Sequence, residues 1–461
     1  MRTKAWAILL AAALTGCVST SVREDRTLVR ELAAVTSELA PVDRPVVDTT
    51  GEDVLALVAQ PVDDNTAVRI ALLNNRELRA QLRELGIARA RLLGANMLPN
   101  PMFEAELQPE RQTGVELRLE WNIAGLLLAP LRSEAASADL DRARLEVAGA
   151  VIDLGYRVRV AFYELQAAEE ILSITQHALE ALGAAQEAAH ALREAGNMRE
   201  LDVAARDAAV EDERVRVAEA ELEALVAREH LQRLLGLHGD ETEWTVSGAL
   251  PHAPAEDADV EGLERRAIEA SLELRALRAR MVGAARRAGL ARVEGMLPEV
   301  LVDVHVLVGD STAETLVGGG LAVRLPIFDR GDAEVAAFEH TLDATFERYV
   351  GMAIDVRSQA RESRARVLSS GSRARQYENV ILPARRRVLD ETLLQYNAMQ
   401  MSIFSLLSAL RERQMREVDA IRTRREYACA LAGMEALLAG HHVSATGTTR
   451  SAASTGSEGG H

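Results

Sequence analysis

Residues 114–121 read Gly-Val-Glu-Leu-Arg-Leu-Glu-Trp, a strict alternation of apolar and charged side chains after the glycine. Successive side chains of a β-strand point to opposite faces, so this order separates an apolar face from a charged one. The stretch therefore predicts a strand whose charged face carries Glu116, Arg118 and Glu120.

Three further stretches alternate in the same way: residues 102–108, 299–308 and 318–325. Four strands per chain, apolar on the outside and charged on the inside, form the pattern of a lipid-facing β-barrel. We expect the charged side to line a lumen, with contributions from Glu104, Glu106, Glu116, Arg118, Glu120, Asp303, His305 and Arg324.

Four strands cannot close a barrel wide enough for an aqueous lumen, so several protomers would have to share one. A second interpretation stays open: two hairpins packed on a helical body, with their charged face in water. Aromatic residues make up only 3% of the chain, and Phe103 and Trp121 alone lie in the strand cores. Thin aromatic girdles favour this second interpretation.

The chain also repeats itself. Leu78-Arg79-Ala80 begins a helical stretch that ends in Leu98-Pro99, and Leu274-Arg275-Ala276 begins one that ends in Leu297-Pro298. Alternating residues and then a very long helical pattern follow each Leu-Pro. The repeated unit is helix, strand, strand, long helix, turn and helix, over residues 65–250 and again over 251–438, with turns near 196 and 397.

The long helical patterns cover about residues 131–195 and 329–395, and the two short helices of each half together match one long helix in length. At 1.5 Å per residue, each rod would be roughly 100 Å long. Their apolar residues step by three, four or seven, as in a coiled coil. The fold class is therefore mainly α with a small β part, although periodicity alone does not distinguish a helical tunnel from an antiparallel bundle.

The N-terminus is typical of a secretory signal peptide over residues 1–16, with a cationic start and a short apolar run. Leu14-Thr15-Gly16-Cys17 resembles a bacterial lipobox, which would place a covalent lipid on Cys17; an ordinary signal peptide with a chance cysteine is the alternative. No Asp follows Cys17, which by analogy favours the outer membrane. We expect residues 17–64 to form a lipidated lead and residues 439–461 to form a disordered tail. The tail histidines could bind a metal, but incidental solvated histidines are the simpler interpretation.

Composition excludes several classes of function. The net charge of −17 argues against nucleic acid as a partner. Lys4 is the only lysine, so a catalytic lysine, a Schiff-base cofactor and a Walker loop are excluded. We find no catalytic motif and no metal-ligand motif, and we expect no enzyme activity, no metal and no cofactor other than the lipid.

Together, the repeat, the strand pairs and the helix lengths resemble the TolC-like outer-membrane efflux channel family, over about residues 65–438. The segments 98–101 and 297–298 look like its helix-to-strand junctions, and 325–331 looks like its strand-to-helix junction. Residues 196–202 and 396–407 look like its two helical hairpin turns. Each motif alone is weak, but their order and duplication are specific.

The resemblance implies a homotrimer in the outer membrane of a Gram-negative bacterium, with one shared barrel and a helical tunnel through the periplasm. A periplasmic adaptor and an inner-membrane pump would dock at an entrance formed by the turns, with Gly196, Asn197, Asp202, Asn397, Met399 and Ser405. Some members narrow this entrance with acidic side chains, but residues 397–408 contain none. The chain would act as a passive conduit with mild cation preference. The exported substrate stays open, as do two alternatives: a lipid-anchored periplasmic adaptor, or a scaffold without a pore.

Overall fold

The structure is a computed structural model that describes residue 27 and residues 51–108, 114–254, 260–297, 299–308 and 316–442. The expected signal peptide, Cys17 and most of the lipidated lead lie outside the described residues. The tail from residue 443 onward lies outside them as well.

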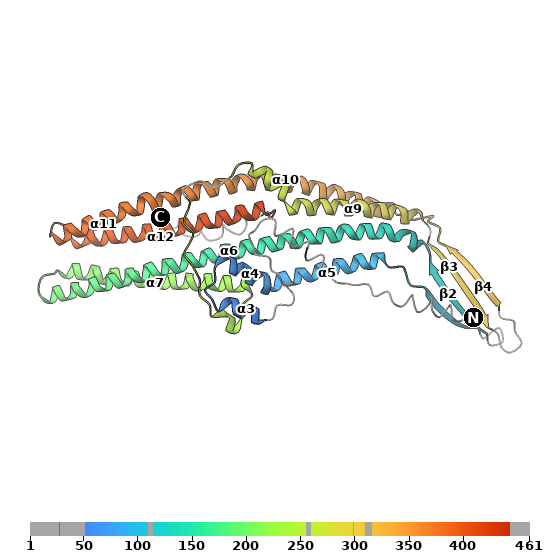
Figure 1. The fold of residues 1–461 in the computed structure, drawn as a ribbon, viewed down its shortest axis with the longest axis horizontal. Coiled ribbons are helices and arrows are strands. Elements are labelled where there is room, and N and C mark those ends of the chain that lie inside the picture. The colour runs from blue at the N-terminus through green and yellow to red at the C-terminus, as the bar shows by residue number, and fades with distance from the viewer. Residues whose placement is uncertain are drawn as a thin grey trace, which may run out of the picture. The chain divides into compact units, whose positions relative to one another are not determined.

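The element order repeats once along the chain, as Figure 1 shows. The first half contains α3 (Gly51–Val58), α4 (Asp64–Asn74), α5 (Arg76–Asn96), β1 (Met102–Gln108), β2 (Gly114–Asn122), α6 (Ala124–Glu194) and α7 (Glu200–Leu235). The second half contains α8 (Leu263–Ala270), α9 (Leu272–Met296), β3 (Val300–Val308), β4 (Leu316–Val323), α10 (Asp332–Gln376), α11 (Leu382–Asn397) and α12 (Ile403–Leu438). Short helical turns at Gly239–Thr242 and Tyr377–Ile381 complete the order.

The chain divides into two units, which are described separately. The first holds Ala80–Ala148 and Leu272–Ala353, and therefore contains all four strands. These strands form one antiparallel sheet in the order β1-β2-β3-β4, so the last strand of the first repeat pairs with the first strand of the second. The sequence had predicted two strand pairs, and the structure joins them.

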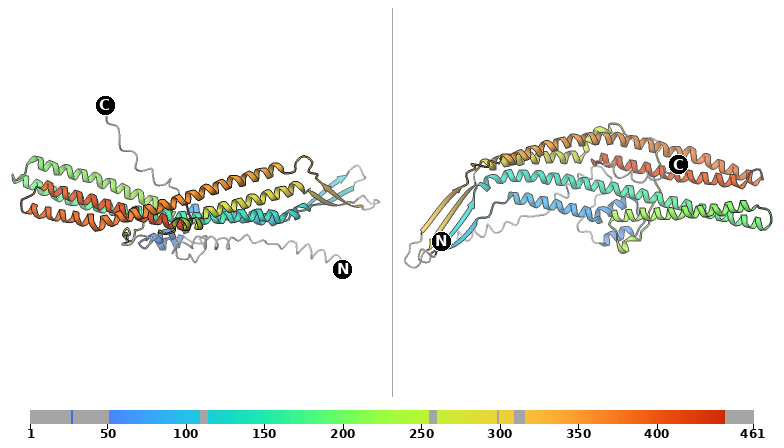
Figure 2. Two further views of the ribbon diagram at one scale, coloured as in Figure 1. Left: turned by 90° about the horizontal axis from the view of Figure 1, so that it is seen from above. Right: turned by 180° about the vertical axis from the view of Figure 1, so that it is seen from behind.

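The second unit holds Ala33–Arg79, Gly149–Ser271 and Ile354–His461. Two helical hairpins dominate it, one from α6 and α7 and one from α11 and α12, and Figure 2 shows each pair running side by side from two directions. Ala167, Leu250 and Ile421 are fully buried together, with Tyr163 and Ile171 packed against them. This apolar cluster joins helices of both repeats to the segment that connects them.

Each repeat begins with two short helices that are separated at the same place. Asn75 and Ser271 stand three residues before Leu78 and Leu274, and they separate α4 from α5 and α8 from α9. The Asn75 side chain accepts a hydrogen bond from the Leu78 N–H at 3.0 Å, as an N-cap residue does. Its amide also donates to the Leu234 carbonyl at 2.9 Å, which fixes the break by tertiary contact.

A π-helical turn at Tyr377–Ile381 precedes Pro383 in the second long helix. Proline has no N–H and its ring crowds the preceding turn, so the wider turn accommodates it without ending the helix. The local widening thus lies just before Pro383.

Two predicted boundaries are wrong. The tail was expected to begin at residue 439, but ordered chain continues beyond α12, and the His441 ring is only 18% exposed because it pairs with Asp153 at 3.2 Å. His441 is therefore not a solvated tail residue. The fourth strand was expected over residues 318–325, but β4 covers Leu316–Val323.

Candidate functional site

The sheet register gathers the predicted lumen residues on one face. Glu104 lies opposite Arg118, Arg118 opposite His305, and His305 opposite Gly318, so one row crosses all four strands. The neighbouring rows add Glu106, Glu116, Glu120 and Asp303 to the same side. Seven of the eight residues predicted to line a lumen therefore share one face of the sheet.

The other face is apolar at every position. It is formed by Phe103, Ala105 and Leu107 of β1, the odd-numbered residues 115–121 of β2, the even-numbered valines 300–308 of β3, and Val317, Gly319, Leu321 and Val323 of β4. Several of these side chains are largely exposed in the single chain: Phe103 by 66%, Val317 by 71% and Leu107 by 77%. A contiguous apolar surface of this kind marks contact with lipid or with protein.

Charges on the polar face form local pairs. Arg118 donates to Glu116 at 3.0 Å, and His305 Nδ1 lies 2.9 Å from Asp303 Oδ2. The face carries five carboxylates against one guanidinium and one imidazole. Its potential is therefore negative, which attracts cations.

Glycines make room for the second of these pairs. A methyl group at Gly318 would overlap His305 Nε2, and one at Gly320 would overlap Asp303 Oδ1. Both side chains of β3 thus extend across the glycines of β4. Only glycine leaves room at these two positions for the side chains of β3.

Arg324 is the exception among the predicted lumen residues. It lies one residue beyond β4, its side chain is 82% exposed, and it pairs with Glu299 at 3.0 Å. Its backbone N–H also donates to the Glu299 carbonyl at 3.0 Å. The prediction that Arg324 is a strand residue is wrong, because β4 ends at Val323 and, among the described residues, Arg324 keeps only this one backbone hydrogen bond beyond it.

The first hairpin turn follows α6. Gly196 has a φ of 76°, a left-handed conformation that glycine adopts without strain, and the Asn197 N–H reaches back to the Leu192 carbonyl at 2.9 Å. Asp202 lies in the first turn of α7 and pairs with Arg199 at 3.0 Å, which leaves only 14% of its side chain exposed. The Asp202 carboxylate is therefore largely covered and is paired with a cation of its own turn.

The second hairpin turn follows Asn397, the last residue of α11. Met399 has a φ of 58° and is 94% exposed, although methionine rarely adopts this conformation. The Gln400 N–H donates to the Gln395 carbonyl at 2.9 Å, which closes the turn. Ser402 caps α12 by accepting the Ser405 N–H, so Ser405 belongs to the cap.

Two buried charges that join the hairpins were not predicted from the sequence. Arg206 of α7 is 3% exposed and lies 5.8 Å from the ring centre of Phe404 of α12. Glu213 is 1% exposed and accepts from Gln414 at 2.6 Å and from Arg216 at 2.8 Å. Both follow the apolar stripe of α7 at steps of three and four, so a charge inside a coiled-coil stripe is the signal that could have found them.

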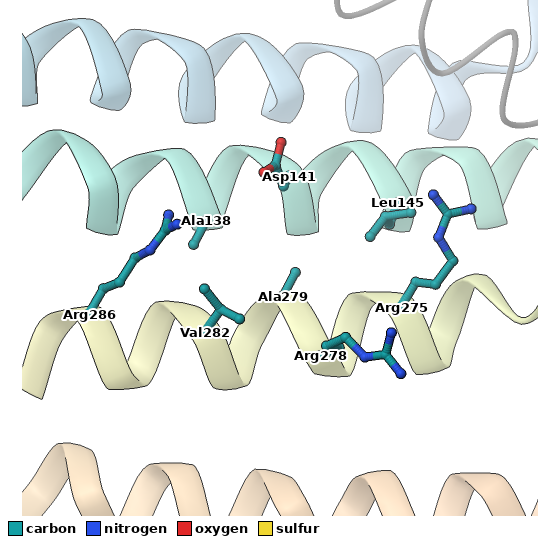
Figure 3. A pocket seen from close by; sticks show the side chains of 8 residues that line it. All are labelled: Ala138, Asp141, Leu145, Arg275, Arg278, Ala279, Val282 and Arg286. Atoms are coloured by element: carbon teal, nitrogen blue, oxygen red, sulfur yellow. The ribbon is translucent and has the colours of Figure 1, made fainter.

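A groove of about 280 Å³ lies between α6 and α9 (Figure 3), and Arg275, Arg278 and Arg286 line it. Arg286 donates to the Glu134 carbonyl at 2.7 Å and to the Ser137 hydroxyl at 3.0 Å, while Arg278 reaches the Tyr349 hydroxyl at 3.3 Å. These arginines join three helices of the first unit, so the groove is a structural feature.

Within the described residues, no group of three or more histidine, cysteine, aspartate or glutamate side chains is placed to hold a metal ion. None of the described helices has a stretch long and apolar enough to cross a membrane.

The fold is that of solved outer-membrane channels. The outer-membrane channel OprN matches with a TM-score of 0.68 and 20% identity, over 82% of this chain and 90% of OprN. The open state of the MtrE outer membrane channel of Neisseria gonorrhoeae matches with a TM-score of 0.67 and 19% identity, over 88% and 94%. The predicted mainly helical fold with a small antiparallel sheet, and its resemblance to these channels, are thereby confirmed.

In sequence, the chain is similar to the cobalt-zinc-cadmium resistance protein CzcC of Cupriavidus metallidurans, with 23% identity over 367 residues. These cover 77% of this chain and 84% of CzcC. No family model matches the chain.

Proposed function

We propose that the chain is the outer-membrane channel subunit of a tripartite efflux system, and that it acts as a passive conduit. The two-faced sheet is the observation that carries this proposal. One face has no charged residue and is largely exposed, and the other face holds every charged residue of the four strands. A sheet between hydrocarbon and an aqueous lumen requires this separation.

Closure of the sheet calls for further copies of the chain. Within the described residues, β1 pairs only with β2, and β4 only with β3, so each has a free edge. Unpaired backbone groups are not tolerated in lipid, and closure removes them. Three copies would supply twelve strands to one barrel, with β4 of each copy beside β1 of the next.

The remaining parts of the proposal concern anchoring and partners. A lipid on Cys17 would tether the mature chain to the outer membrane of a Gram-negative bacterium. The turns at Gly196 and Met399 would form the periplasmic entrance, where an adaptor and an inner-membrane pump dock. Energy would come from the pump, because the chain offers no catalytic motif.

Positively charged substrates fit the polar face best. Five carboxylates per copy would make the barrel interior attractive to cations. The name of the similar protein CzcC refers to cobalt, zinc and cadmium. We therefore include divalent metal ions in the proposed substrate class.

Conductance across a planar bilayer tests this function. The purified full-length protein should form trimers with discrete, cation-preferring channels, and Glu116→Gln with Glu120→Gln should reduce that preference. Glu77→Gln, on helix α5, serves as the control. A Cys17→Ala form that is monomeric, fully water-soluble and without conductance would refute the channel and favour an adaptor or scaffold.

A further inference from the structure

We propose that the barrel contains divalent metal sites shared between neighbouring copies, each formed by His305 of one copy, which Asp303 holds in position, and a β1 glutamate of the next. The inference rests on the proposed trimeric barrel, since the site is incomplete in one chain. Imidazole and carboxylate ligands together suit Zn²⁺ and related divalent transition metals.

The orientation of the histidine is the first argument. His305 Nδ1 lies 2.9 Å from Asp303 Oδ2, and a proton on Nδ1 makes this a hydrogen bond to the carboxylate. That tautomer leaves the Nε2 lone pair available, which is the usual arrangement of a metal-binding histidine supported by a carboxylate. The Asp303 and His305 side chains are 20% and 34% exposed in the single chain.

The glycines of β4 are the second argument. His305 Nε2 lies over Gly318 and Asp303 Oδ1 lies over Gly320, where any larger side chain would overlap them. The His305 ring and the carboxylate that holds it therefore already reach across β4 toward its free edge. Arg118, the cation opposite His305, is engaged by Glu116 at 3.0 Å in its own strand.

The neighbouring strand supplies the missing ligand. When β4 pairs with β1 of the next copy, the polar faces of the two strands must lie on the same side of the barrel. A shift of the register by one residue would place every polar side chain on the apolar side. Gly318 and Gly320 would then face two successive members of the series Met102, Glu104, Glu106 and Gln108. Every such pair includes a glutamate, so any register that places both glycines opposite β1 brings a carboxylate to the site.

The distances allow coordination. Adjacent strands lie about 4.8 Å apart, so the next copy's β1 runs about one strand spacing beyond Gly318. A glutamate side chain spans that gap, and zinc needs ligand atoms at about 2.0 to 2.2 Å. The barrel would hold three such sites, one at each junction between copies.

Zinc block of single-channel current tests the site. We expect micromolar Zn²⁺ to reduce the current of the wild-type trimer, and His305→Asn to weaken this block by about tenfold or more. His340→Ala, on the exposed side of α10, should behave as wild type. Gly318→Ala should also weaken zinc block, because its methyl group would displace the imidazole.

A complementation experiment tests the sharing between copies. Subunits with His305→Asn and subunits with Glu104→Gln and Glu106→Gln are co-expressed with different tags, and mixed trimers are purified. One junction in each mixed trimer combines an intact histidine with intact glutamates, so zinc block should return. Either parent homotrimer should lack it.

The results separate the two proposals. Conducting trimers that zinc does not block, or that it blocks equally in the His305→Asn variant, would overturn the metal site and leave the channel standing. Failure of complementation would overturn the sharing of ligands between copies. Absence of both trimers and conductance would overturn the proposed function, and the site with it.

Discussion

Arginine placed on either face of β3 should have very different effects. Val306 belongs to the apolar face, opposite Leu117 and Val317, while the next residue, Leu307, belongs to the polar face, opposite Glu116. Val306→Arg and Leu307→Arg therefore introduce the same charge at nearly the same height in the sheet. Only the side differs, which makes each variant the control for the other.

The structure sets the size of the effect. Val306 is two residues from Val304, the centre of the nine-residue strand. At about 3.4 Å per residue and a tilt of about 40°, it would lie roughly 5 Å from the membrane midplane, well inside an apolar band about 25 Å tall. Arginine there costs about 2 kcal/mol per copy, or about 6 kcal/mol per trimer if the copies act independently. Leu307→Arg should cost much less, because Glu116 lies opposite.

Urea unfolding of the detergent-solubilised trimer measures the loss of stability in each of the two variants. The yield of heat-resistant trimer is a second measure. We expect Val306→Arg to unfold at clearly lower urea and Leu307→Arg to remain near wild type. A sheet with both faces in water would place both variants within about 0.5 kcal/mol of wild type. Equal, small effects would therefore refute the assignment of the apolar face to lipid.

Three further outcomes concern the helical part. Glu213→Ala should lower the free energy of unfolding in urea by about 3 kcal/mol, because it removes the acceptor of the Gln414 hydrogen bond in a buried seam. Glu213→Gln should lower it by less, and equal losses in the two variants would contradict the role of the charge. Burial raises the pKa of the Cys429 thiol to about 12, so maleimide should label it roughly a thousandfold more slowly than an exposed cysteine at pH 8, and rapid labelling of the folded protein would contradict this. Burial alone would raise the pKa of Asp153, but the hydrogen bond from His441 and the charge of Arg157 outweigh it and lower the pKa below the ordinary 3.8. The carboxylate therefore stabilises the fold above that pH, and the stability gap between wild type and Asp153→Asn should close as the pH falls below about 3.8; a gap that persists at lower pH would contradict the pairing.

The sequence predicted the sheet well because alternation is a local signal. Side chains at positions such as Glu104, Arg118 and Asp303 must share a face once the strands pair antiparallel in register. The Leu-Pro junctions and the duplicated helix lengths likewise predicted where helices give way to strands. These features depend on neighbouring residues alone, so one sequence was sufficient.

The missed features depend on partners that are distant in the chain. Alternation does not say which strands pair, so the junction of β2 with β3 was not predicted. Arg324 continues the alternation but lies beyond the ladder, and His441 lies in a polar segment yet pairs with Asp153. Arg206 and Glu213 belong to residue types that usually lie at the surface. They are buried because α12 packs against them.

The thin aromatic content was the main argument for a water-facing sheet, and the positions of these residues weaken it. Phe103 is the second residue of β1, Trp121 is the last but one of β2, and Phe328 follows β4 by five residues. Each therefore lies close to the junction between a strand and its helix, and Phe328 is fully exposed. Trp121 satisfies its indole N–H at the Pro99 carbonyl, 2.8 Å away, which frees the ring to face an apolar surface. Aromatic rings are enriched where a barrel meets the lipid headgroups, so three rings per copy at this rim would form one girdle. A sheet packed on the helical body would instead bury its apolar face, yet Phe103 and Val317 are mostly exposed.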